Sequence, residues 1–131
     1  MAHPNEELLR EAAAAFQRGD MEALQSKYFA PNIRYHVGGR SAISGDYEGV
    51  AQVLGLYGRL FELSGGTVRV ELHDVVANDE HAIALLTIRA ERGGRQLDAN
   101  EVLVAHPGPD GKVAEVWTIG SDPYAAQEFW S

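Results

Sequence analysis

The chain has 131 residues, no cysteine and a formal net charge of −8, with 11 Lys and Arg against 19 Asp and Glu. This length fits one domain, residues 1–131, that can bury a core without a disulfide or a metal. The lack of cysteine excludes disulfide scaffolds, thiolate metal sites and cysteine nucleophiles. An acidic surface repels phosphate backbones and anionic membranes, so we expect neither nucleic acid nor a membrane as a partner.

The N-terminal segment also bears on location. Three of its first eleven residues are acidic, whereas a signal peptide begins with basic residues and continues with a long apolar run. No apolar run approaches the roughly 20 residues that span a bilayer. The sequence therefore predicts a cytoplasmic enzyme, binding module or interaction protein.

The first half of the chain has helical periodicity. Apolar residues recur at helical spacing over 5–18 and again over 50–63, and a shorter helix is expected over 20–29, where Ala30-Pro31 stops it. A short strand over 33–37 and a glycine-rich loop lie between the second and third helices. We therefore expect three helices and one strand before residue 65.

After Gly65-Gly66 the apolar period changes to two. Four strands are expected, over 67–77, 81–91, 95–106 and 112–119, and a short helix over 124–130 closes the chain. The turns between these strands are tight, which implies an antiparallel, strongly twisted sheet. The pattern predicts an α+β domain in which a curved sheet packs on the helices.

Several segments in this order resemble the nuclear transport factor 2-like superfamily, in its SnoaL-like and ketosteroid isomerase-like branch. They are FQRGDMEALQSKYFAPNIRYHV, SGDYEGVAQVLGLYGRLF, VVANDEHAIAL, DGKVAEVW and DPYAAQEFWS. The resemblance covers roughly residues 5–131. It implies a cystatin-like α+β roll: a cone-shaped curved antiparallel sheet wrapped around three N-terminal helices, with a short C-terminal helix, an apolar pocket and often a homodimer.

The isomerase branch uses a carboxylate base and two hydrogen-bond donors, and the resemblance places these on three positions of this chain. The base position falls on His36, and the donor positions fall on Ala12 and Leu103. Neither Ala nor Leu can donate a hydrogen bond. A donor of this kind is typically worth about 3–4 kcal/mol of the barrier, so the steroid isomerase mechanism is not expected here.

Three titratable residues are candidate acid and base groups. His36 titrates near neutral pH and is expected to point into the cone as a base. Asp74 continues the Val70 and Leu72 register, and Glu101 continues the register of its own strand, so both carboxylates are expected to face the pocket. The alternatives are a solvent-facing histidine, a bulge beside either acid, or a salt bridge to a neighbouring arginine.

Three further residues are candidate ligand contacts. Trp117 and Tyr57 are expected to form apolar walls of the pocket, with plain core packing as the alternative. Arg40 lies in the loop beside His36 and could hold an anionic group. The five histidines lack metal-binding spacing and no phosphate-binding loop occurs, so neither a metal nor a cofactor is expected.

These observations predict a SnoaL-like protein that binds a small, largely apolar organic molecule. One form of the hypothesis adds isomerase- or cyclase-like proton transfer, with His36 as base and Glu101 or Asp74 as its acid partner. The alternative is a non-catalytic ligand-binding or protein-interaction module. The strand over 81–91 is apolar on both faces, and helices can cover only one, so we also expect a homodimer.

Overall fold

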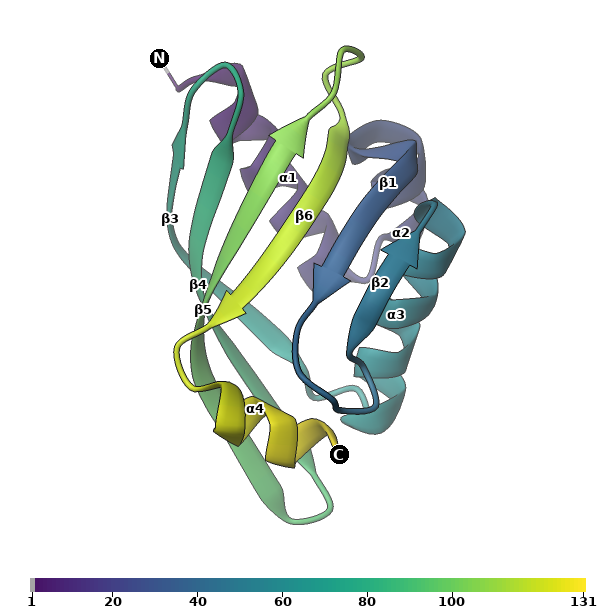
Figure 1. Ribbon diagram of the computed structural model, residues 1–131, viewed down its shortest axis with the longest axis vertical. Helices are drawn as coiled ribbons and strands as arrows, with labels where there is room; N and C mark the ends of the chain where they lie inside the picture. Colours follow the sequence, from purple (N-terminus) through teal and green to yellow (C-terminus); the bar gives the residue numbers. More distant parts are fainter. Residues whose placement is uncertain (1) are drawn as a thin grey trace.

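A computed structural model describes residues 2–131, and it is an α+β domain in which one curved sheet packs against helices (Figure 1). The elements in chain order are α1 (Pro4–Arg18), α2 (Met21–Ala23), the π-helical turn η1 (Leu24–Tyr28), β1 (Phe29–Val37), β2 (Gly45–Glu48), α3 (Val50–Leu63), β3 (Arg69–Ala77), β4 (Ala82–Arg92), β5 (Arg95–Pro107), β6 (Val113–Gly120) and α4 (Pro123–Trp130). The expected fold class and the order of long elements are confirmed. The second helix, expected over 20–29, is instead the short α2 followed by η1, and β1 begins at Phe29, four residues before the expected strand.

The helices begin and end where local chemistry requires it. The His3 side chain accepts a hydrogen bond from the Asn5 amide at the start of α1, and Gly19, with φ of 72°, ends the helix in the left-handed conformation. Asp20 caps α2 by accepting from the Ala23 amide, and Asp122 caps α4 in the same way. The predicted bounds of α3 agree with the structure at both ends.

The sheet has six strands in the order β2-β1-β6-β5-β4-β3. Strands β3 to β6 form antiparallel hairpins, as expected, but β1 runs parallel to β6, with Tyr35 opposite Val116. The glycine-rich loop also contains a strand that the sequence did not predict, because β2 pairs with β1 over only four residues. The sheet is therefore mixed at one end.

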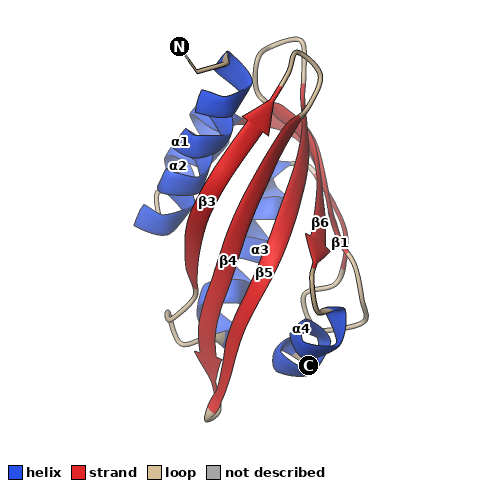
Figure 2. Cartoon of the chain, turned by 90° about the vertical axis from the view of Figure 1, so that its left-hand side faces the viewer, coloured by secondary structure: helices blue, strands red, loops and turns tan. Residues whose placement is uncertain are grey.

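The two faces of the sheet differ in their surroundings. Helices α1 and α3 lie on one side of it, and no helix of residues 2–131 lies over the other side of β3, β4 and β5 (Figure 2). The face toward the helices carries the buried residues of the strands, among them Ile33, Tyr35, Leu86 and Ala105. We call these the inner and the outer face.

One irregularity in β3 changes which residues face the helices. A β-bulge lies between Leu72 and Asp74. Before it, Val70 lines the interior. After it, Val75 is buried and Val76 is 53% exposed. The bulge therefore turns Asp74 and Val76 to the outer side, because one extra residue reverses the alternation of a strand.

Helix α4 follows the lower end of β6 and packs against β5 and β6 (Figure 1). Two arginines from the β4–β5 hairpin bind its last carbonyls: Arg92 Nη1 donates to Phe129 O at 3.0 Å, and Arg95 Nη1 to Glu128 O at 2.9 Å. On its other side, Gln127 Oε1 accepts from the Arg40 amide at 2.6 Å. Within residues 2–131, no helix has both the length and the apolar character needed to cross a membrane.

Candidate functional site

An apolar cavity of about 130 Å³ lies between the inner face of the sheet and the helices. Its walls come from α1, α3, five of the six strands, the loop before β2 and the last residue of α4. Lining residues include Leu9, Ala12, Phe16, Tyr35, Val37, Leu56, Tyr57, Ala84, Leu86, Glu101, Leu103, Thr118 and Trp130. The interior forms because the strands alternate with period two and the helices contribute one apolar stripe each.

Among the described residues that line the cavity, Glu101 is the one carboxylate. It lies on β5 opposite Leu86 of β4 and Gly120 of β6. The walls around it are apolar, and removal of the carboxyl group from water raises its pKa to about 7. Desolvation is the only cause of this shift, so no arginine or hydrogen-bond donor stabilises the charged form. A carboxyl group with a pKa near 7 can both give and take a proton at neutral pH.

Two tyrosines bring hydroxyl groups to the same cavity. Tyr57 of α3 donates a hydrogen bond to the Tyr35 hydroxyl of β1 at 3.2 Å. Their rings meet edge to face at 5.7 Å, and Tyr57 also packs edge to face on Phe16 at 4.8 Å. Burial raises the pKa of both hydroxyl groups, so both remain protonated at neutral pH.

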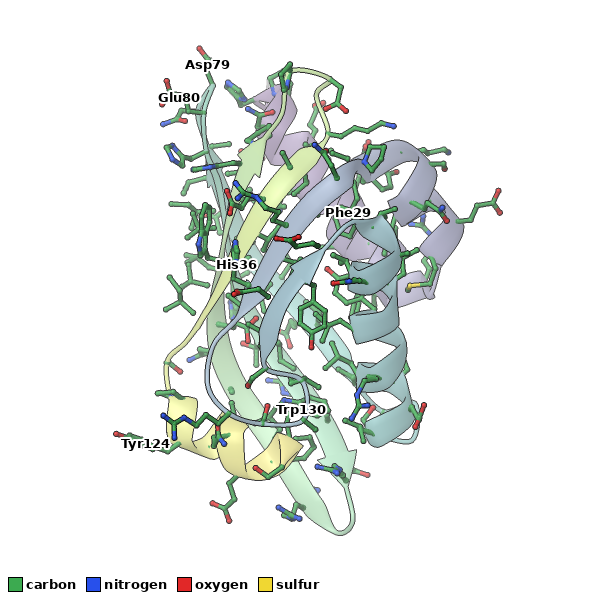
Figure 3. All side chains as sticks on the ribbon, turned by 45° about the vertical axis from the view of Figure 1, so that its right-hand side comes forward. Phe29, His36, Asp79, Glu80, Tyr124 and Trp130 are labelled. Carbon is green, nitrogen blue, oxygen red and sulfur yellow. The ribbon has the colours of Figure 1, made fainter. Side chains whose placement is uncertain are left out.

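The end of the cavity is closed by two segments. Trp130 at the end of α4 lines the cavity, in the lower part of the molecule as drawn in Figure 3. Ile43 from the loop between β1 and β2 is buried beside it. The Ala42 amide donates to the Trp130 carbonyl at 3.2 Å, so the loop and the helix are held to each other.

His36 does not point into the cone, and that expectation is wrong. Its neighbours Tyr35 and Val37 line the cavity, so the alternation of β1 sends His36 to the outer face (Figure 3). There its Nδ1 lies 2.7 Å from Asp46 Oδ1 and its Nε2 lies 2.7 Å from Glu115 Oε2. Hydrogen bonds to these two carboxylates raise the pKa of His36. The imidazole therefore binds β2, β1 and β6 together.

Three other candidates also lie outside the cavity. Trp117 is on the outer face, stacked on the His36 ring at 5.5 Å, so it is not a pocket wall. Asp74 lies after the bulge and pairs with Arg10 at 3.2 Å, so it does not face the pocket. Arg40 is exposed in the loop, and its side chain does not reach the lining. Of the six candidates, the structure brings Glu101 and Tyr57 together.

Sequence reasoning missed Tyr35, which completes the polar part of the cavity. A signal was present, because Ile33, Tyr35 and Val37 share one side of β1 and form the more apolar register. The apolar register of a half-buried strand faces the core. Ala12 and Leu103 do line the cavity, so neither isomerase-type donor exists at those positions. Within residues 2–131 no three His, Asp or Glu side chains cluster as metal ligands.

The comparisons with known proteins agree with this architecture. A family model described as a SnoaL-like domain matches residues 9–116. The chain belongs to the SnoaL-like family. An uncharacterised protein of Mycobacterium tuberculosis H37Rv is 36% identical over 127 residues, 95% of each chain.

Solved structures place the SnoaL-like chain among proteins of the nuclear transport factor 2-like fold. Bal32a, from a soil-derived mobile gene cassette, is 35% identical, with a TM-score of 0.93 over 98% of this chain and 97% of its own. TerC, co-crystallised with polyporic acid, is 20% identical, with a TM-score of 0.83 over 97% of this chain and 98% of its own. At that identity the likeness to TerC shows the fold alone.

Proposed function

We propose that the protein binds a small, largely apolar organic molecule in the cavity and that Glu101 transfers a proton to or from it. The observation that carries this proposal is the position of Glu101. It is the lone carboxylate among apolar walls, and burial raises its pKa to about 7. Perturbed pKa values cluster at functional sites, and an apolar cavity with a few polar groups is the common form of a ligand site.

The size of the cavity limits the ligand. A closed cavity of roughly 150 Å³ in another protein takes up benzene, and the cavity here measures about 130 Å³. A molecule with one ring therefore suits the closed form, and a larger one needs a movement of α4. The best source of the proton is a carbon atom next to a carbonyl group. The Glu101 carboxylate takes the proton, the electron pair of the C–H bond forms a C=C bond, and the π electron pair of the carbonyl moves to its oxygen.

The test is deuterium exchange into phenylacetone, whose benzylic hydrogens lie next to a carbonyl. Proton NMR in D₂O should show catalysed loss of the benzylic signal with the wild type and about 10²-fold less with Glu101→Gln. The matched control is Asp74→Asn, which removes a carboxylate outside the cavity. Equal exchange by wild type and Glu101→Gln would remove Glu101 from the chemistry.

The second candidate function is non-catalytic binding in the same cavity. It is favoured by the absence of a donor at Ala12 and Leu103. Phenylacetone that raises the melting temperature of the wild type but exchanges no faster than in buffer would support this reading. If no single-ring compound raises the melting temperature of the protein, both the catalytic and the non-catalytic function are contradicted.

A second copy of this chain is the partner that we propose for the outer face. Apolar side chains gather there on neighbouring strands: Val76, Ile83, Leu85, Val102, Val104, Trp117 and Ile119. Leu85 and Ile119 are 42% and 55% exposed. The charges around them are paired within the chain, as in His36 with Asp46 and Arg89 with Glu71. Two acidic copies can therefore meet here without strong repulsion.

Sedimentation tests the dimer directly. The wild type should sediment at twice the chain mass of 14.3 kDa. Leu85→Asp should shift it to monomer, because a charge would lie in an apolar contact. Tyr124→Asp is the control, since Tyr124 is 85% exposed on α4 and does not belong to the strands of the outer face. A wild type that stays monomeric at tens of micromolar would overturn the proposal.

A further inference from the structure

We infer that the cavity selects molecules that carry a hydrogen-bond acceptor oxygen, a carbonyl above all, and that the Tyr35 hydroxyl binds this oxygen. The inference rests on the proposed function, because it concerns the ligand of the same cavity. It adds the chemical group that the ligand must present and the residue that recognises it.

The first step is a count of hydrogen-bond donors. Tyr35 and Tyr57 carry one O–H each, and one bond joins them, with Tyr57 as donor and Tyr35 as acceptor. The Tyr57 hydrogen is therefore used, and the Tyr35 hydrogen has no acceptor among the hydrogen bonds of residues 2–131. A buried donor without a partner costs about 1–3 kcal/mol, so an acceptor in the cavity is favourable.

The second step asks which protein groups compete for that hydrogen. Thr118 also lines the cavity and its oxygen could accept, but its hydroxyl is turned to the His36 carbonyl, to which it donates at 3.2 Å, and no hydrogen bond joins it to Tyr35 within residues 2–131. Glu101 acts on both tyrosines only through its charge, and no hydrogen bond reaches it. The remaining walls are apolar. The acceptor must therefore come with the ligand.

The third step concerns how firmly the donor is held. The Tyr57 ring packs against three other aromatic rings. The distances between ring centroids are 4.8 Å to Phe16, 6.1 Å to Phe29 and 5.7 Å to Tyr35. These contacts fix the Tyr57 hydroxyl, which in turn fixes the Tyr35 oxygen by donating to it. Tyr57 is thus a positioning residue, and Tyr35 is the residue that meets the ligand. Preorganised donors of this kind give orientation in otherwise apolar sites.

The experiment compares two probes of equal shape. Acetophenone has a C=O group where α-methylstyrene has C=CH₂, so the two differ in the acceptor oxygen. Their dissociation constants are measured by calorimetry for the wild type, Tyr35→Phe and Tyr57→Phe. The ratio of the two constants is compared between proteins, because the different hydration of the free probes then cancels.

The expected result separates the two tyrosines. Tyr35→Phe should weaken acetophenone about tenfold relative to α-methylstyrene, the effect of one lost hydrogen bond. Tyr57→Phe should weaken acetophenone by a smaller factor, about two- to threefold, because the Tyr35 O–H is still present but is no longer held in place by the Tyr57 hydroxyl. An unchanged ratio in Tyr35→Phe, with both probes still binding, would overturn this inference and leave the proposed function standing. Failure of both probes to bind the wild type would overturn both.

A second measurement uses the wild type alone, so it does not depend on whether a variant folds. The infrared carbonyl stretch of ¹³C-labelled acetophenone falls in frequency when the oxygen accepts a hydrogen bond. Bound to the wild type, it should lie below its value in hexane. A bound probe with the hexane frequency would contradict the inference without any substitution.

Discussion

The inner and outer faces of the sheet treat titratable groups in opposite ways. On the outer face, His36 lies between Asp46 and Glu115, and both of its ring nitrogens have partners at 2.7 Å. On the inner face, Glu101 has apolar neighbours and a pKa raised by burial alone. The outer group has its partners inside the chain and stabilises the sheet. The inner group lacks such a partner, which is the condition for acting on something else.

The largest effect should come from two adjacent leucines of β4 that face opposite sides. Leu86 is 4% exposed on the inner face, and Leu85 is 42% exposed on the outer face. Leu86→Ala should lower the free energy of unfolding by about 3 kcal/mol, because core methyl groups are lost and a larger void remains. Leu85→Ala should cost less than about 1 kcal/mol in the monomer.

Chemical denaturation of both variants, at concentrations where the chain is monomeric, measures this difference. A Leu86→Ala variant as stable as Leu85→Ala would mean that the inner face contributes no more than the outer one. The assignment of the core to the inner face would then be wrong.

Glu101→Gln tests the inner face through the pH dependence of stability. The pKa of Glu101 rises from 4.5 in the unfolded chain to about 7 in the fold. The native state therefore holds more protons between these values, and wild-type stability falls as pH rises from 4.5 to 7. The glutamine variant lacks this loss. It should be more stable than the wild type at pH 8, by up to about 3 kcal/mol, and equally stable at pH 4.

Thermal unfolding at the two pH values measures the effect, with Asp74→Asn as the control for loss of an exposed acid. A Glu101→Gln variant that gains nothing at pH 8 would show that water reaches the carboxyl group. The inner face would then not differ from the outer face in how it treats a titratable group.

Arg92→Ala tests how the inner face is kept closed. Its guanidinium donates to the carbonyls of Phe129 and Ser131 at the end of α4. Loss of these charge-assisted bonds should cost about 1–2 kcal/mol and loosen Trp130. In a Trp117→Phe background, the emission of Trp130 should shift to longer wavelength. Arg69→Ala, at an exposed position of β3, is the control, and an equal shift there would contradict the role of Arg92.

His36→Gln should have the smallest effect, and its sign is set by the raised pKa. The ion pairs stabilise the fold fully below the unfolded pKa of 6.5, and this stabilisation is lost as pH rises through the higher folded pKa. The side chain is 27% exposed, so the gain is less than about 1 kcal/mol. The variant should be less stable than the wild type at pH 6 and equal to it at pH 9.

Asp46→Asn serves as the matched variant for His36→Gln, since it removes one of the same pairs. Urea denaturation at both pH values measures the two differences. A deficit of His36→Gln that persists unchanged at pH 9 would indicate lost packing on Trp117 in place of lost charge.

Periodicity in the sequence was sufficient for the long helices α1 and α3, the closing helix α4 and the four antiparallel strands. It failed at β2, a four-residue strand that exists only because β1 pairs with it. It also failed at Asp74, since a bulge depends on the partner strand and leaves no mark in the alternation. Glu101 was placed correctly because its strand is regular. His36 was misplaced because the family position of a base outweighed the alternation of its own neighbours.

The parallel pairing of β1 with β6 has a consequence for the order of events during synthesis. His36 and Glu115 are 79 residues apart in the chain, yet they lie on adjacent strands. The N-terminal third therefore leaves the ribosome long before β6 has been synthesised, and the apolar side chains of β1 stay exposed to water during that time. The β3–β6 hairpins have short loops and can form first. Pulse-labelling of amides during refolding should show protection in β4 and β5 before β1, so the helix-rich half is the part that depends on rapid completion of the chain.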